Sequence, residues 1–266
     1  MKGSKREVEK QKADRLGEEK LNHQGCLMKI ISYNKVSDIV VEFQDKYKTK
    51  VHTEYGNFLS GGVKNPYCPS VFEIGVIGTK YPLKVDGKQT KEYQVWKAML
   101  QRCYDEKYKK RYSTYKSIIC CNEWLLFENF YEWLHEQENF DKWIVSERWA
   151  IDKDILIKRN KLYSPETCCL VPQSVNTIFT KHNLDRGNLP IGVTKHGKVF
   201  QTRCQNPILN KSICLGNYST INEAFQAYKA YKEDIIKQVA EIEYQNGNIT
   251  KQCYEAMMNY IVEIDD

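Results

Sequence analysis

Long apolar segments are missing from this sequence. No apolar run in its 266 residues approaches the roughly 18–20 residues that a membrane-spanning helix needs. Residues 1–20 are almost wholly polar, so they lack the apolar core of a secretory signal peptide. We therefore expect a cytoplasmic protein with no membrane partner.

The sequence also lacks any Cys-x-x-Cys pair, although it contains 10 cysteines. The cysteines are scattered, apart from the adjacent pairs Cys120–Cys121 and Cys168–Cys169. Adjacent cysteines seldom bind one metal ion or each other without strain, so their spacing argues against a structural zinc. Because a secretory signal is missing, we expect reduced thiols that are mostly buried as small apolar side chains.

Charge is unevenly distributed, although the net charge is only +6. Residues 97–116 carry seven basic and two acidic side chains, and residues 177–218 carry six and one. The last stretch, residues 219–266, carries four basic and nine acidic side chains. A basic middle beside an acidic tail indicates a polyanion-binding surface, although a solvated charged face would give the same pattern.

The pattern of apolar residues predicts a modular α+β protein. Residues 1–22 form a charged extension, and residues 23–82 form a small β-rich module with runs at 26–33, 38–43, 50–55 and 69–78. Pro82–Thr90 is interpreted as a linker. A central core over 90–183 and a final module over 187–266 complete the chain.

Helical periodicity in the central core predicts helices over 93–104 and 124–136, the second with an aromatic face that belongs to the core. Residues 104–116 between them are rich in tyrosine and lysine and show no burial pattern. This segment is either a solvated loop or a surface that stacks on and neutralises a nucleic acid strand. Residues 148–182 predict a strand, a turn, a second strand and a helix.

A further series of residues runs through the central core in a fixed order: Trp96, Met99, Arg102–Tyr104, Cys121, Trp124, Phe127, Phe130, Ile151–Lys153 and Tyr163–Cys168. The series resembles the HNH endonucleases that are common in phage genomes and mobile introns. The resemblance covers about residues 93–182. It implies a β-hairpin packed on a helix, the ββα-metal core, which holds one divalent ion, Mg²⁺ or Mn²⁺, for phosphodiester cleavage.

The resemblance assigns the metal ligands to Asp152 and Asn176. The family's catalytic histidine is replaced by Lys153, and a protonated lysine is no general base unless its pKa is strongly depressed. Asp154 could substitute as base or second ligand, and His182 lies near the end of the predicted helix. The alternative is that both aspartates are ordinary turn carboxylates and Asn176 is a helix-surface amide.

The last module carries a second series: Leu189–Val193, Val199–Arg203, Leu215–Thr220, Glu223–Ala224 and Ala227–Tyr228. It resembles the DNA-binding domain of plant ethylene-response factors over about residues 187–232. That resemblance implies three strands packed on one helix. The helix is predicted to begin at about Ile221, where an apolar face starts.

Residues 199–205 support this interpretation independently, because small or apolar side chains alternate with long polar ones. One face can pack on the helix. The other offers Gln201, Arg203 and Gln205 to the major groove, where Arg reads guanine and Gln reads adenine. Lys195, Lys198 and Lys211 are expected to contact phosphates. The alternative is a sheet that exposes ordinary polar residues.

Together these patterns predict a DNA-binding, metal-dependent endonuclease of phage or mobile-element type that acts on double-stranded DNA in the host cytoplasm. The replacement of the motif histidine leaves a second hypothesis open. The same scaffold could have lost catalysis and could bind DNA as a regulator, or bind a host protein as an inhibitor.

Overall fold

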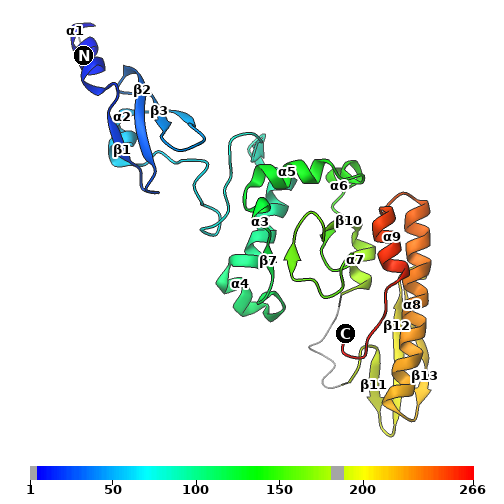
Figure 1. The fold of residues 1–266 in the computed structure, drawn as a ribbon. Helices are drawn as coiled ribbons and strands as arrows, with labels where there is room; N and C mark the ends of the chain where they lie inside the picture. The colour runs from blue at the N-terminus through cyan, green and yellow to red at the C-terminus, as the bar shows by residue number, and fades with distance from the viewer. Residues whose placement is uncertain (1–4, 181–188) are drawn as a thin grey trace. The chain divides into compact units, whose positions relative to one another are not determined.

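The computed structural model describes residues 5–180 and 189–266, with side chains from Glu9 onward (Figure 1). The chain forms two compact units. The first unit extends to Ser113 and includes Asn122–Tyr131, and the second comprises Thr114–Cys121 and Glu132–Asp266. Both contain helices and small sheets, so the predicted α+β class is confirmed. No helix within the described residues has the length and apolar character needed to cross a membrane.

Four antiparallel strands form the sheet of the first unit, in the order β1-β2-β3-β4. The elements are α1 Lys5–Arg15, β1 Glu19–Leu21, β2 Leu27–Lys35, β3 Asp38–Phe43, β4 Lys50–Thr53 and α2 Tyr55–Ser60. Alternate residues of β3 (Ile39, Val41 and Phe43) are buried on one face, where Phe58 of α2 packs against them. The β-rich module is therefore present, and its first strand comes from the segment predicted as a charged extension.

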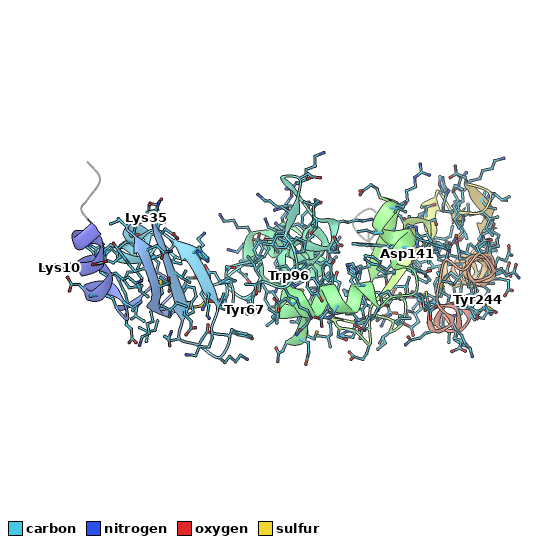
Figure 2. The ribbon with its side chains drawn as sticks, turned by 90° about the horizontal axis from the view of Figure 1, so that it is seen from above. Lys10, Lys35, Tyr67, Trp96, Asp141 and Tyr244 are labelled. Carbon is cyan, nitrogen blue, oxygen red and sulfur yellow. A yellow bond between two sulfur atoms is a disulfide. The ribbon has the colours of Figure 1, made fainter. Side chains whose placement is uncertain are left out.

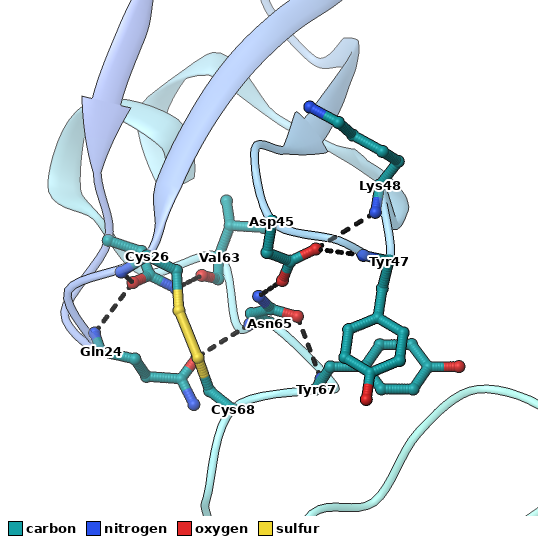
Figure 3. The surroundings of a disulfide bond; sticks show 10 residues. Gln24, Cys26, Asp45, Tyr47, Lys48, Val63, Asn65, Tyr67 and Cys68 are labelled. Atoms are coloured by element: carbon teal, nitrogen blue, oxygen red, sulfur yellow. Dashed lines mark hydrogen bonds between the residues drawn. A yellow bond between two sulfur atoms is a disulfide. The ribbon is translucent and has the colours of Figure 1, made fainter.

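A disulfide joins Cys26 and Cys68, so the expectation that all cysteines are reduced is wrong (Figure 3). The two residues are 42 positions apart, and no spacing rule connects them. They meet because the chain after α2 folds back on the sheet. Asn65 anchors this return: its side-chain amide donates to Asp45 (2.7 Å), and its backbone N–H donates to the Gln24 side-chain oxygen (2.8 Å).

Two predicted helices of the central core form as expected, as α3 Lys91–Tyr104 and α5 Phe127–His135. Trp96, labelled in Figure 2, is fully buried, and its indole N–H donates to the Trp124 carbonyl (2.7 Å). Phe127 lies against the Trp96 ring, with 5.3 Å between the ring centroids. The aromatic face of α5 is therefore core, as the sequence predicted.

Residues 69–78 were predicted as a β run, and this prediction is wrong. Phe72 and Glu73 have φ angles of 50° and 63°, and a single bridge between Val71 and Gly75 closes a tight turn around them. The left-handed conformation of two successive residues interrupts any strand. The linker at 82–90 in turn holds a short hairpin, β5 Lys84–Val85 and β6 Lys88–Gln89.

The segment 104–116 contains a helix where a structureless loop was expected. α4 covers Glu106–Arg111, and η1 covers Ser113–Tyr115. The Asp105 carboxylate caps α4, because it accepts hydrogen bonds from the backbone N–H groups of Lys107 and Tyr108. This local cap explains a helix that has no buried face to reveal it in the sequence.

The second unit contains the strand, turn, strand and helix predicted at 148–182. Its elements are β7 Ile119–Cys120, α6 Phe140–Val145, β8 Trp149–Asp152, β9 Leu162–Tyr163, β10 Cys169–Pro172 and α7 Gln173–Ile178, and η2 Glu123–Leu125 belongs to the first unit. β8 and β10 pair antiparallel, with Asp152 opposite Cys169. A β-hairpin followed directly by a helix is thus confirmed, and His182 lies outside the described residues.

The final module has the three strands and the helix that were predicted. They are β11 Val193–His196, β12 Val199–Asn206, β13 Lys211–Tyr218, α8 Ile221–Gln245 and the added helix α9 Lys251–Met258. Figure 1 shows the sheet lying along α8, with α9 beside the other end of that helix. Thr220 and Glu223 form a capping box that begins α8 at Ile221, as the sequence predicted.

Helix α8 contributes residues to two hydrophobic clusters in the second unit. The first part of α8 packs on the three-stranded sheet through Ala224, Phe225 and Tyr228. The later part packs on the β8/β10 hairpin and α7 through residues that include Ile235 and Ile236. α8 therefore joins the hairpin and the sheet, which the sequence divided between two modules.

Candidate nucleic-acid interface

Asp152 ends strand β8 and is buried, with 8% of its surface exposed. One of its carboxylate oxygens accepts hydrogen bonds from the backbone N–H groups of Asp154 (2.7 Å) and Ile155 (2.8 Å). This is the side-chain turn that an aspartate forms after a strand. Burial raises the pKa of the Asp152 carboxyl above its ordinary value, and the two N–H bonds offset part of that rise.

Lys153 is held inside the loop of the hairpin. Its ammonium group donates to the Asp154 carboxylate (2.7 Å) and to the Asn160 carbonyl (2.9 Å). The Asn160 side chain donates in return to the Lys153 carbonyl (2.9 Å). Because Asp154 and Asn160 occupy its ammonium group, Lys153 ties the two ends of the loop together.

These residues do not fit the divalent ion that the HNH resemblance implies. Asp152 commits one oxygen to the turn, and Lys153 supplies an ammonium where the family has an imidazole. A cation beside a carboxylate weakens that carboxylate's attraction for a metal ion. Asn176 lies half-buried on α7, and within the described chain no hydrogen bond joins it to Asp152.

A different group of carboxylates lies close enough together for a metal ion. In the described part of the chain, Glu263, Asp265 and Asp266 place oxygens within 4.8 Å of one another. Two cations already contact them: Lys158 lies 2.8 Å from Asp266, Arg159 lies 2.6 Å from Asp265, and both also contact Glu263. These contacts tie the C-terminal tail to the hairpin loop, and no local sequence pattern predicts them.

Strand β12 carries the row of polar side chains that the alternation predicted. Thr202 and Cys204 are buried against α8, whereas Arg203 and Gln205 are exposed and Gln201 is half-exposed. The hydroxyl of Thr202 donates to the Ala224 carbonyl of α8 (2.8 Å), which fixes the sheet to the helix. The outer face of the sheet is therefore polar, and it points away from the helix.

Side-chain hydrogen bonds also link the polar residues of this row to one another and to β13. Arg203 donates through Nε to the Gln201 side-chain oxygen (3.2 Å), and Gln201 donates to Asn217 of β13 (3.4 Å). This orients the guanidinium group, and its two terminal nitrogens have no hydrogen-bond partner among the described residues. A guanidinium held by Nε presents those two nitrogens as a fork toward an acceptor pair.

The register places other side chains on this outer face. Gln201 lies opposite Thr194 and Asn217, and Arg203 lies opposite Cys214. A bulge at Thr202/Arg203 shifts the register of β13, and Gly216 accommodates it with a φ of 140°. Sequence reasoning missed Thr194 and Asn217, because only the strand register brings them beside the row.

The three predicted phosphate contacts occupy different places. Lys198 lies in the turn between β11 and β12, whereas Lys195 pairs with Phe200 and Lys211 pairs with buried Asn206. Paired residues share a face, so Lys195 and Lys211 occupy helix-side positions at the ends of the strands. All three lysines are exposed, but the structure does not bring Lys195 and Lys211 into the row of Gln201, Arg203 and Gln205.

The basic helix α4 of the first unit presents Lys107, Lys110 and Arg111 as exposed side chains. The rings of Tyr108 and Tyr112 lie beside each other on this helix, with 4.6 Å between their centroids. The aromatic and basic character that the sequence indicated is thus displayed on a helix. This basic and aromatic surface suits a polyanion, but it has no row of mutually oriented side chains like the one on β12.

Comparison of this chain with family models, with curated proteins and with solved structures finds no match.

Proposed function

We propose that this protein binds double-stranded DNA through the outer face of its C-terminal sheet. The observation that carries the proposal is the row of Gln201, Arg203 and Gln205, exposed on β12 opposite the face that packs on α8. A small sheet can enter the major groove of B-DNA. There, a guanidinium fork matches guanine and a glutamine amide matches adenine.

We further infer that the hairpin is a scaffold and does not cut DNA by the HNH route. The Lys153 ammonium group donates to Asp154 and Asn160, whereas the HNH route needs a base that accepts a proton from water at this position. One carboxylate oxygen of Asp152 accepts the two backbone hydrogen bonds that form the turn of the loop. Among the hypotheses that the sequence left open, this favours a DNA-binding regulator. A metal-dependent nuclease is the second candidate.

Base reading and phosphate contact can be separated by one pair of variants. A duplex site is first selected from a random library by the full chain, and affinities are then measured by fluorescence anisotropy over a series of salt concentrations. Arg203→Ala should reduce the binding free energy for the selected site by about 1–3 kcal/mol and change it little for unrelated duplexes. Lys198→Ala should weaken binding to all duplexes alike and reduce the salt slope by about 1. An equal loss on all sequences for Arg203→Ala would contradict base reading.

The absence of cutting is tested with supercoiled and linear DNA in the presence of Mg²⁺ or Mn²⁺. We expect binding without cleavage by the wild-type protein. Cleavage that disappears in both Asp152→Asn and Asn176→Ala would establish the nuclease instead. The Asn variant keeps the oxygen that accepts the two turn hydrogen bonds, so a loss of activity there would report chemistry and not unfolding.

A further inference from the structure

A cavity of about 580 Å³ opens beside α8, where this helix passes from the three-stranded sheet to the hairpin. Its walls come from α7, from β11 and β12, and from Tyr228 and Lys232 of α8. The volume lies within the roughly 300–1,000 Å³ that small-molecule sites occupy. It is too large for an inorganic anion alone to fill.

The charge lining this cavity has one sign. Lys195 and Lys232 supply the positive charge, Arg203 borders the cavity from β12 while its guanidinium is held on the outer face by Gln201, and no acidic side chain is found among the described lining residues. Hydroxyl groups of Ser174, Thr177 and Thr180 on and just after α7 also line it. Ile178, Leu189, Ile191, Val193 and Pro207 add apolar surface. Cations and hydroxyls beside an apolar wall favour an anion that carries an organic part.

Lys232 is the unusual member of the lining. Its side chain is partly buried, and its ammonium group has no hydrogen bond or ion pair within the described chain. The nearby carboxylates are engaged elsewhere: Glu233 contacts Lys229 (2.7 Å), and Asp266 contacts Lys158 (2.8 Å). Burial lowers the pKa of Lys232, as expected for a cation that the protein itself leaves uncompensated. A bound anion would supply the missing charge.

We propose that this cavity binds an organic anion of mononucleotide size, with its anionic group on Lys232 and its apolar part against Ile178, Ile191 and Pro207. A nucleotide phosphate meets this description. It could come from a free mononucleotide or from one nucleotide of a bound DNA strand. Binding of such an anion would be a function beyond DNA reading by the outer face of the sheet, and its support comes from the cavity alone.

Binding of dAMP and dTMP to the full chain is measured by calorimetry, with inorganic phosphate as a separate probe. We expect the mononucleotides to bind at least tenfold more tightly than phosphate, because phosphate leaves the apolar wall uncovered. Lys232→Met should reduce nucleotide affinity tenfold or more. Lys232→Arg should keep most of it. Lys237→Met removes an exposed lysine from the same helix, so it is the matched control and should change nothing.

A second variant protects the test if Lys232→Met fails to fold. Thr177 is exposed on α7 and lines the cavity, so Thr177→Trp should fill the space and reduce nucleotide affinity by a similar factor without removing a charge. Thermal melting of each variant verifies the fold. Equal nucleotide affinity in wild-type protein, Lys232→Met and Thr177→Trp would overturn the proposal.

Duplex DNA distinguishes the two sources. Nucleotide binding that Lys232→Met abolishes, together with unchanged duplex affinity, identifies a free nucleotide as the ligand. Reduced duplex affinity in Lys232→Met and Thr177→Trp, with no binding of free nucleotide, identifies a nucleotide of the DNA strand. If free nucleotides do not bind and both variants keep wild-type duplex affinity, the proposal is wrong, even where Arg203→Ala still alters sequence preference.

Discussion

The hairpin loop and the outer face of the C-terminal sheet differ in how far their polar groups already have hydrogen-bond partners within the protein. In the loop, Asp152 and Lys153 are buried: one Asp152 carboxylate oxygen accepts two backbone hydrogen bonds, and the Lys153 ammonium group donates to Asp154 and Asn160. On the sheet, Arg203 and Gln205 are exposed, and the terminal nitrogens of Arg203 have no partner in the described chain. Polar groups that are satisfied internally stabilise a fold, whereas oriented groups without partners are available to a ligand.

This contrast matters because both regions were predicted as functional sites from the same kind of signal. In the sequence, each was predicted from an ordered series of residues that includes polar side chains at fixed spacing. Spacing says which side chains come near one another, but not whether their hydrogen-bonding groups are already occupied. The occupied loop therefore argues for a scaffold, and the unoccupied row argues for recognition.

The largest effect that sharpens the contrast is expected for Asp152→Ala. The substitution leaves two N–H groups, those of Asp154 and Ile155, without an acceptor in a partly or fully buried turn. We expect the free energy of unfolding of the second unit to fall by about 2–3 kcal/mol. Urea unfolding followed by tryptophan fluorescence measures the loss. Glu147→Ala is the control, because Glu147 is an exposed carboxylate just before β8 and should cost less. An equal loss in both variants would contradict the assigned role of Asp152.

The pH dependence of Asp152→Asn tests the same assignment by charge. The folded-state pKa of Asp152 is raised, so the folded protein holds this proton at a pH where the unfolded chain has lost it. The carboxyl therefore destabilises the fold as pH rises through this window, and the cost is complete above the folded-state pKa. Asp152→Asn keeps the acceptor but removes the charge. Its stability relative to wild type should improve as the pH rises above about 4, the ordinary pKa of an aspartate, and urea titrations at each pH measure the difference.

The sequence predicted most of the fold because the signals were local. The apolar face that starts at about Ile221, the alternation along β12 and the strand–turn–strand run at 148–182 each depend on residues close in sequence. The elements that were missed depend on distant contacts or on single caps. The disulfide joins residues 42 positions apart, and α4 begins at the Asp105 cap and has no buried residue that would give it an apolar face.

The candidate sites could be predicted only in part for the same reason. The two faces of β12 follow from the sequence, because side chains alternate by geometry. The placement of Lys195 and Lys211 on the helix side follows from the register, which a bulge at Thr202/Arg203 shifts. The cavity beside Lys232 needs the meeting of α7, α8 and β12, and no local pattern in the sequence encodes that meeting.

The smallest effect concerns the two faces of the sheet, which should respond differently to the same substitution. Thr202→Val removes the hydroxyl that donates to the Ala224 carbonyl, which then keeps only its backbone hydrogen bond within α8. We expect a loss of about 1–2 kcal/mol in the free energy of unfolding, with unchanged DNA affinity in the protein that remains folded. Thr194→Val on the outer face removes an exposed hydroxyl that lies 3.3 Å from the Gln201 carbonyl, so stability should barely change. If Thr194→Val instead destabilised the protein as much as Thr202→Val, the outer face would carry structural bonds, and its availability to DNA would lose its support.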